Sequence, residues 1–598
     1  MSIGSIAVSP RVSCFRDTCN VYVLRGEDGT AVLVDFGDGR VLDHLEELGV
    51  ERVTDVLLTH HHRDQLGGLA RAAQAGIRIW APPSELELIA GMDERWRRRP
   101  TWNDYDLRQD RFSLLRSVPV TGTAAEYRTE RYGAIEAYTL PTPGHTLGSV
   151  TYLVELEGRL LAFTGDLVCG DGRVWSLAAT QWTYSGIEGW ASTIASAAVL
   201  AERAPDLLLP SHGEPVDSPQ AALATLEQRM QRLIDLRLPS PWDALERVHE
   251  PFEEITPNLL RNRTMFATNY VLRSETGAAL LIDFGYDVST TATPTERGAR
   301  RTLLWSLDAL RRDHGVERFD AALVTHYHDD HVAGLNLLRD VEGAEVWAPA
   351  NVAPILEHPE RHDLPCLWFD PIPVDRVIDF EQPFRWHEHE LPLYPLPGHT
   401  RYAAAIAFEV DGKRILVTGD QQTDEADGRS ILNIQYRNRG VPEDFVASAE
   451  LYRSLRPDLI LGGHWLPFEL TDARLRQLTD DAARFVEAHR DVLAGESFGV
   501  EGFGARIEPY RLSPGRNDVV VTVRSPFDRP ETARVRLVLP EGWSAEPAER
   551  HAELEPRGEA EVTFTVEATG RGVLAADLTV GETPFGQQAE AMLECRQR

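Results

Sequence analysis

The sequence lacks the features that mark membrane-spanning, secreted or disulfide-bonded proteins. It has no apolar run of about 18 residues, so no transmembrane helix is expected. The first residues contain no basic stretch followed by an apolar core, so we expect no secretory signal. The five cysteines are few, odd in number and scattered, which indicates a reducing cytoplasm and no disulfide framework. They are Cys14, Cys19, Cys169, Cys366 and Cys595.

Basic residues are also scarce relative to acidic ones. The chain has 61 lysines and arginines against 93 aspartates and glutamates, a formal net charge of −32. Because nucleic-acid phosphates require clustered basic side chains, we expect no nucleic-acid partner and favour a small-molecule substrate. A hydrophobic fraction of 42% is ordinary for globular proteins, and 598 residues are enough for three or four domains.

The densest group of metal-ligating side chains lies at residues 326–331, directly after the apolar run 321–325. It reads His326-Tyr327-His328-Asp329-Asp330-His331. His326 and His328 alternate, so both side chains can point to one side of an extended loop, whereas Asp330 and His331 turn toward a second point. One short loop can therefore hold two cations that act on the same water, which is hydrolase chemistry.

The same pattern occurs earlier in the chain, so the sequence contains a duplication. Residues 60–65 match 326–331, Pro-Gly-His-Thr occurs at 143–146 and 397–400, and Thr-Gly-Asp occurs at 164–166 and 418–420. Late histidines follow at His212 and His464. The offset between copies is nearly constant, apart from about 18 extra residues before His326 in the second copy. Residues 301–310 within this insertion predict a lengthened helix.

This ordered set of motifs resembles the metallo-β-lactamase-fold hydrolase superfamily, over about residues 1–240 and again 255–490. The resemblance implies an α/β (α+β) fold with two tandem αββα domains. It also implies that His326, His328 and His399 hold a first zinc, that Asp330, His331 and His464 hold a second, and that Asp420 bridges them.

The first copy departs from the family pattern at one position, because Gln65 stands where the second-site histidine is expected. A glutamine carbonyl is a weak zinc ligand compared with imidazole. The second metal could bind weakly, the site could hold one metal, or the copy could have lost catalysis. The other implied ligands are present: His60, His62, Asp64, His145, Asp166 and His212.

Three further side chains near these motifs are expected to act away from the metals. His61 is expected to face away, since its neighbours on both sides point inward. Asp35 and Asp283 close apolar strands, and we expect each to accept a structural hydrogen bond, or one from a ligand histidine, rather than to bind metal.

The C-terminal region follows a different pattern. Period-two alternation at 519–523, 533–539, 560–566 and 573–580, separated by turns, predicts an antiparallel β-sandwich that resembles immunoglobulin-like accessory domains. The predicted organisation is a domain at 1–240, a linker at 241–254, a domain at 255–495 and the sandwich at 505–598.

The leading hypothesis is a dinuclear zinc hydrolase whose second copy is the main catalytic centre. Two zinc ions would lower the pKa of a bridging water to about 7, and the hydroxide would attack a small ester, thioester or lactone. Asp330, Asp420 and Asp64 are the candidate catalytic residues. Two zinc ions are expected in the second copy and one or two in the first, although iron and manganese also suit these donors.

The first copy also resembles glyoxalase II in its motifs, but two alternatives remain. One is mononuclear iron chemistry of the persulfide dioxygenase type in one copy. The other is a first copy that serves only as a non-catalytic scaffold. The sequence assigns no substrate-binding residue.

Overall fold

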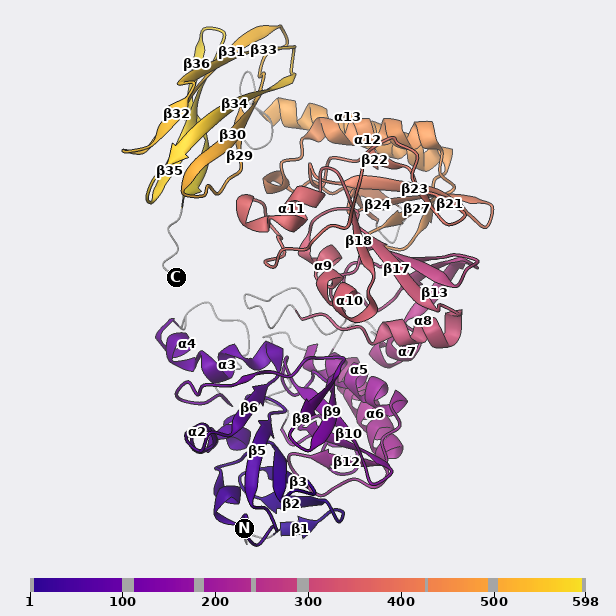
Figure 1. Cartoon of the computed structure of the whole chain (residues 1–598). Helices are drawn as coiled ribbons and strands as arrows, with labels where there is room; N and C mark the ends of the chain where they lie inside the picture. Colours follow the sequence, from indigo (N-terminus) through magenta and orange to yellow (C-terminus); the bar gives the residue numbers. More distant parts are fainter. Residues whose placement is uncertain are drawn as a thin grey trace. The chain divides into compact units, whose positions relative to one another are not determined.

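The chain forms two compact units, which are described separately. The computed structural model describes residues 5–98, 112–176, 188–237, 243–287, 301–424, 429–492 and 504–593 (Figure 1). Unit 1 contains Met1–Glu253, Arg263–Phe266 and Tyr286–Gly315, and unit 2 contains Glu254–Asn262, Ala267–Gly285 and Val316–Arg598. The predicted boundaries at residues 240 and 495 lie outside the described residues, and so does Cys595.

Unit 1 is built on two β-sheets. The first sheet runs antiparallel from β1 to β4 and parallel from β4 to β7. Its strands are β1 (Ser5–Ala7), β2 (Val12–Arg16), β3 (Asn20–Arg25), β4 (Thr30–Val34), β5 (Arg52–Leu57), β6 (Arg78–Ala81) and β7 (Gly122–Thr123). The second sheet has the order β12 (Leu207–Pro210), β11 (Arg159–Gly165), β10 (Val150–Leu156), β9 (Ile135–Pro141) and β8 (Thr129–Tyr132).

Three apolar clusters hold the layers of unit 1 together. Val32 and Leu57 of the first sheet pack against Tyr152 and Phe163 of the second. The outer face of the first sheet packs against η1 (Arg40–Asp43), α1 (Arg63–Leu66), α2 (Leu69–Gln74) and α3 (Glu87–Ala90). The unit also contains η2 (Pro83–Glu85) and α4 (Met92–Arg98). The second sheet packs against α5 (Glu188–Glu202), α6 (Pro219–Arg237) and α7 (Ala244–His249) (Figure 1). This order of layers is the predicted αββα fold.

Unit 2 repeats the arrangement. Its first sheet has the order β13 (Phe252–Thr256), β14 (Leu259–Asn262), β15 (Tyr270–Arg273), β16 (Ala278–Ile282), β17 (Arg318–Leu323), β18 (Glu345–Pro349) and β19 (Arg376–Ile378). The second has the order β22 (Leu393–Pro395), β23 (Ala404–Val410), β24 (Lys413–Gly419), β27 (Leu459–Gly462) and β28 (Phe468–Glu469). Two short hairpins are β20 (Arg385–Trp386) with β21 (His389–Glu390), and β25 (Gln422–Asp424) with β26 (Ser430–Leu432).

Helices flank both sheets of unit 2. On the first sheet, α10 (Leu335–Glu342) contacts β17 and β18. On the second, α12 (Pro442–Leu455) and α13 (Asp472–Val492) bury Tyr452 and Leu478 against Leu396 and Leu416 (Figure 1). The remaining short helices are α9 (Asp329–Val332), α11 (Ala353–Glu357), η5 (Pro359–Arg361) and η6 (Tyr436–Asn438).

The insertion of the second repeat differs from its prediction. The predicted helix at 301–310 is instead α8 (Ser306–His314), and residues 301–305 are not helical. Leu303 and Trp305 enter the cluster of unit 1 that contains Ile194, and the amide of Leu304 donates to the Tyr127 hydroxyl at 2.9 Å. These contacts hold the segment away from the helical path, so tertiary packing overrides the local helical preference.

The C-terminal part of unit 2 is all β. One four-stranded sheet has the order β29 (Ala505–Glu508), β30 (Gly515–Arg524), β34 (Glu559–Ala568) and β32 (Ser544–Glu546). The other has the order β33 (Glu549–Leu554), β31 (Glu531–Val538), β35 (Gly572–Val580) and β36 (Thr583–Leu593). Alternate residues such as Val521, Val535 and Phe564 are buried in one core, which confirms the predicted sandwich.

Two expectations from composition can also be compared with the structure. The four cysteines among the described residues are all free. Within the same residues, no helix combines the length and apolar character needed to cross a membrane.

Candidate metal centres

The predicted ligands of the second repeat meet where strands of unit 2 end. His326 and His328 follow β17, Asp330 and His331 lie in α9, and His399 lies in the turn between β22 and β23. Asp420 directly follows β24, and His464 follows β27. Gly419 makes the turn into Asp420 possible, since its φ is 51° and a Cβ there would lie 2.9 Å from Thr325 Oγ1.

These side chains form two adjacent groups with Asp420 between them. The ligand atoms of His326, His328, His399 and Asp420 all lie within 4.8 Å of one another, and those of Asp330, His331 and His464 do so as well. Asp420 Oδ2 lies 3.6 Å from His399 Nε2 and 3.2 Å from His464 Nε2, and its Oδ1 lies 3.4 Å from His331 Nε2. One carboxylate therefore reaches both groups.

The donor set of this centre fits divalent metal ions. Among the described residues, Nε2 of His326 and His331 and Oδ1 of Asp420 are buried without a hydrogen-bond partner, while His328 turns its Nδ1 toward His399 Nε2 at 3.2 Å. An unsatisfied buried polar atom costs about 1–3 kcal/mol, so three of them in one group are unfavourable unless a cation satisfies them. Imidazole and carboxylate donors suit zinc, iron and manganese.

Hydrogen bonds at the other ring nitrogens orient these imidazoles. His326 Nδ1 lies 3.0 Å from Thr325 Oγ1, and His331 Nδ1 lies 2.8 Å from Asp283 Oδ2. His399 Nδ1 lies 3.0 Å from the carbonyl oxygen of Asn433. Asp283 thus supports a ligand histidine, as predicted. Such contacts fix the tautomer and leave Nε2 free to bind a metal ion.

Burial keeps two of the histidines in the form that binds metals. It lowers the pKa of His328 to about 3, and the nearby His399 adds to the effect. Burial also lowers the pKa of His326 well below its ordinary value, with His331 adding to the shift. Both rings are therefore neutral at physiological pH, as metal coordination requires.

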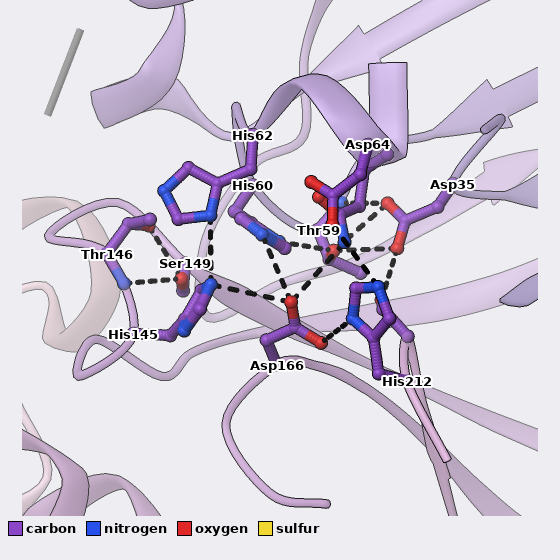
Figure 2. Close-up of polar contacts among 12 residues, drawn as sticks. Asp35, Thr59, His60, His62, Asp64, His145, Thr146, Ser149, Asp166 and His212 are labelled. Carbon is purple, nitrogen blue, oxygen red and sulfur yellow. Dashed lines mark hydrogen bonds and ion pairs between the residues drawn. The ribbon is translucent and has the colours of Figure 1, made fainter. Parts of the chain in front are cut away.

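The first repeat brings its predicted residues together in the same way (Figure 2). His60, His62 and His145 form one group, in which His145 Nε2 lies 2.9 Å from His62 Nδ1. Asp166 Oδ2 lies 3.4 Å from His145 Nε2 and 3.7 Å from His60 Nε2. The second group contains Asp64, Asp166 and His212.

The second group of the first repeat is internally hydrogen-bonded. His212 Nδ1 lies 2.8 Å from Asp166 Oδ1, and His212 Nε2 lies 3.2 Å from Asp64 Oδ2 (Figure 2). Burial opposes a positive charge on His212, but the hydrogen bonds to Asp166 and Asp64 raise its pKa to about 10. Asp35 contacts Thr59 and Ser211 instead of a ligand histidine, which is the structural hydrogen bonding predicted for it.

His61 is turned toward Glu85, in agreement with its predicted orientation. Its Nδ1 contacts the buried Glu85 carboxylate, which also accepts hydrogen bonds from Thr146 Oγ1 at 2.7 Å and from the Gly148 amide at 2.8 Å. Glu85 therefore links the His60–His62 segment to the turn that carries His145.

Sequence reasoning missed Glu85, Ser211 and Asn433. Ser211 directly precedes His212, where the other repeat has Gly463, so comparison of the repeats could have identified it. Glu85 and Asn433 belong to no repeated motif.

Comparison with known proteins identifies the family. A family model described as the metallo-β-lactamase superfamily matches residues 15–212 and 263–464. The chain belongs to this superfamily. Each matched region contains one of the two centres, so the predicted tandem duplication is confirmed.

Relatives within the superfamily include hydroxyacylglutathione hydrolases. The enzyme of Bradyrhizobium sp. (strain BTAi1 / ATCC BAA-1182) is 28% identical over 164 residues, which are 27% of this chain and 53% of the relative. That of Fuscovulum blasticum is 27% identical over 250 residues, 39% of this chain and 82% of the relative. The chain thus spans about half the length of the first of these relatives. The similarity agrees with the predicted glyoxalase II-like motifs.

Similar solved structures are metallo-β-lactamases. MIM-1 from Novosphingobium pentaromativorans has a TM-score of 0.32 and 17% identity, covering 41% of this chain and 92% of its own. DIM-1 has a TM-score of 0.29 and 16% identity, covering 39% of this chain and 96% of its own.

Proposed function

We propose that the chain is a zinc-dependent hydrolase of small esters, thioesters or lactones, with the centre of the second repeat as its main catalytic site. The observation that supports this most strongly is the group of buried, unpartnered ligand atoms on His326, His331 and Asp420. Superfamily membership and the similarity to hydroxyacylglutathione hydrolases support hydrolysis, and thioesters are the bond class those relatives suggest.

Each residue has a distinct role in this proposal. When bound, a pair of divalent ions lowers the pKa of water to about 7 and polarises the substrate oxygen. His326, His328 and His399 would hold one ion, and Asp330, His331 and His464 the other. Asp420 lies between the groups and would orient the attacking water and accept its proton. Asp283 and Thr325 would keep the rings of His331 and His326 in place.

The test combines metal analysis with substrate assays on the full chain. Zinc content should be measured beside hydrolysis of a chromogenic ester, thioester, lactone, phosphodiester and β-lactam. Asp330→Ala should lower hydrolysis by more than about 100-fold and reduce bound zinc, because it removes a ligand of the second group.

Asp64→Ala is the matched control, since Asp64 occupies the equivalent position in the first repeat. It should leave most of the activity if the second repeat is the main site. Full activity of Asp330→Ala would contradict the proposal, and iron at about one ion per chain would instead favour oxygenase chemistry.

A further inference from the structure

Asp35 and Asp283 occupy equivalent positions in the two repeats, but their carboxylates have different hydrogen-bond partners. Asp283 accepts hydrogen bonds from the Thr325 amide and hydroxyl, both at 2.7 Å, and pairs with His331 Nδ1 at 2.8 Å. Asp35 accepts the same two hydrogen bonds from Thr59, but its third donor is the Ser211 hydroxyl at 2.6 Å. Ser211 thus supplies the hydrogen bond that a histidine at position 65 would have supplied.

Steric crowding disfavours a serine before the late histidine when a histidine also stands at the position of His331. Ser211 corresponds to Gly463 in the second repeat, since each directly precedes the late histidine. A Cβ on Gly463 would lie 2.0 Å from Asp420 Oδ1 and 2.8 Å from His331 Cε1. A serine at this position therefore requires both the Asp420 carboxylate and the His331 ring to shift. Since Asp166 and Ser211 coexist in the first repeat, the contact that distinguishes the two repeats is the one with the imidazole. Gln65 and Ser211 form a matched pair, and so do His331 and Gly463.

The Gln65 amide lies where the imidazole of a second-site histidine is expected, and its nitrogen is a hydrogen-bond donor. Gln65 is fully buried, and its Nε2 donates to Asp166 Oδ2 at 3.3 Å. With the amide turned over, the nitrogen instead donates to His60 Nε2 at 3.3 Å and to Asp64 Oδ1 at 2.6 Å. In either orientation the amide nitrogen donates to at least one side chain of the ligand group, so part of the second position is filled by a hydrogen-bond donor instead of a metal ligand.

The late histidines are also used differently. His464 approaches both Asp330 and Asp420 with the same atom, Nε2, at 3.1 and 3.2 Å, as ligands of one ion would. His212 uses two atoms, Nδ1 toward Asp166 and Nε2 toward Asp64. The ring of His212 therefore joins two carboxylates by hydrogen bonds, so these groups are satisfied without a cation.

We propose that the first repeat is a one-metal centre, in which His60, His62 and His145 hold a single divalent ion with Asp166. Gln65, Ser211 and His212 occupy the second position as a hydrogen-bonded network. This proposal rests on the proposed function in that the ion is the metal of the hydrolase, and it makes the chain asymmetric, with one ion in the first centre and two in the second.

Metal content of the full chain tests this assignment without an activity assay. After loading with zinc and removal of loosely bound metal, the wild-type chain should retain about three ions, counted by plasma mass spectrometry. Q65H/S211G should retain one more ion, because it installs the donor and removes the crowding. Q65H alone should gain none, since Ser211 still occupies the space beside the new ring.

The reverse exchange in the second repeat is the matched control. H331Q/G463S should lose one ion, and cobalt substitution should show the corresponding loss of visible absorption. Four tightly held ions in the wild type, or a full extra ion in Q65H alone, would overturn the proposal. So would a folded Q65H/S211G variant that gains nothing. An empty second centre lowers the counts of the wild type and of Q65H/S211G by two each but leaves the gain in Q65H/S211G, which separates failure of the proposed function from failure of this proposal.

Discussion

The Asp283 carboxylate connects the end of β16 to residues 325–331, the loop that carries four of the predicted ligands. It is buried, accepts hydrogen bonds from the Thr325 amide and hydroxyl, and pairs with His331 Nδ1. Every group around it donates a hydrogen bond, so an amide at this position would direct an N–H toward other donors. The contact therefore determines the direction of the His331 ring as well as the packing of the loop.

Asp283→Asn should lower zinc affinity of the second centre by about 10- to 100-fold, the usual cost of losing such a supporting contact. Competition with a chromogenic chelator would measure the change. Asp320→Asn is a suitable control, because Asp320 lies on β17, the strand that pairs with β16 before Asp283, but contacts His387 and Trp386. Equal losses in both variants would mean that Asp283 acts only on general stability.

The ligands could be predicted from the sequence, but most of their supporting contacts could not. His326, His399 and His464 belong to motifs that recur in both repeats, so spacing alone identifies them. Glu85 and Asn433 reach the centres only because loops from distant parts of the chain fold beside them. No periodic pattern encodes such a meeting of loops.

At the scale of elements, the insertion before α8 shows where helical periodicity misleads. Arg301 is buried, forms an ion pair with Glu126 and donates through Nη1 to the carbonyl oxygen of Leu147 at 2.7 Å. Leu147 lies two residues after His145, so this contact supports the turn that carries a predicted ligand. Residues 301–305 are therefore stabilised by contacts with other segments of unit 1 rather than by helical hydrogen bonds of their own.

Arg301→Met should destabilise unit 1 by about 2–4 kcal/mol, because it leaves the largely covered Glu126 carboxylate without its cation. Thermal unfolding of the metal-loaded chain would report the loss. Adding Glu126→Gln should recover part of it, since the unpaired charge is then removed.

Arg312→Met is the control for this pair. Arg312 also contacts a glutamate, Glu202, but both side chains are partly exposed, so the cost should be below about 1 kcal/mol. If Arg301→Met were equally mild, the segment would not support the turn.

At the scale of the molecule, the sandwich contacts the second repeat beside its metal ligands. Arg401 and Tyr402 follow His399 by two and three residues. Arg401 pairs with Glu559 at 2.8 Å, and the Tyr402 hydroxyl donates to Glu508 at 2.6 Å. Burial and the Glu508 carboxylate raise the pKa of Tyr402 to about 12, so the phenol remains a donor at physiological pH. The sandwich therefore fixes the segment that follows His399.

Glu508→Gln/Glu559→Gln should weaken this contact by about 1–2 kcal/mol, because the Tyr402 hydroxyl loses a charged acceptor and the partly exposed Arg401 loses its carboxylate partner. Hydrogen exchange of residues 399–402 should then accelerate. Asp577→Asn is the control, since it removes an ion pair with Arg536 within the sandwich itself. Unchanged exchange in the double variant would contradict a positioning role for the sandwich.

The charge on Glu559 also gives this contact a pH dependence. Burial opposes ionisation, but the hydrogen bond from Arg401 and the charge of Arg506 hold the pKa of Glu559 below its ordinary value of 4.5. A carboxylate with a lowered pKa stabilises the folded state above pH 4.5, and this contribution is lost as the pH falls through the folded-state pKa. The difference in exchange between the wild type and Glu559→Gln should therefore be full at pH 7 and shrink below pH 4.5. A difference that persists unchanged in acid would show that the ion pair does not hold the two parts together.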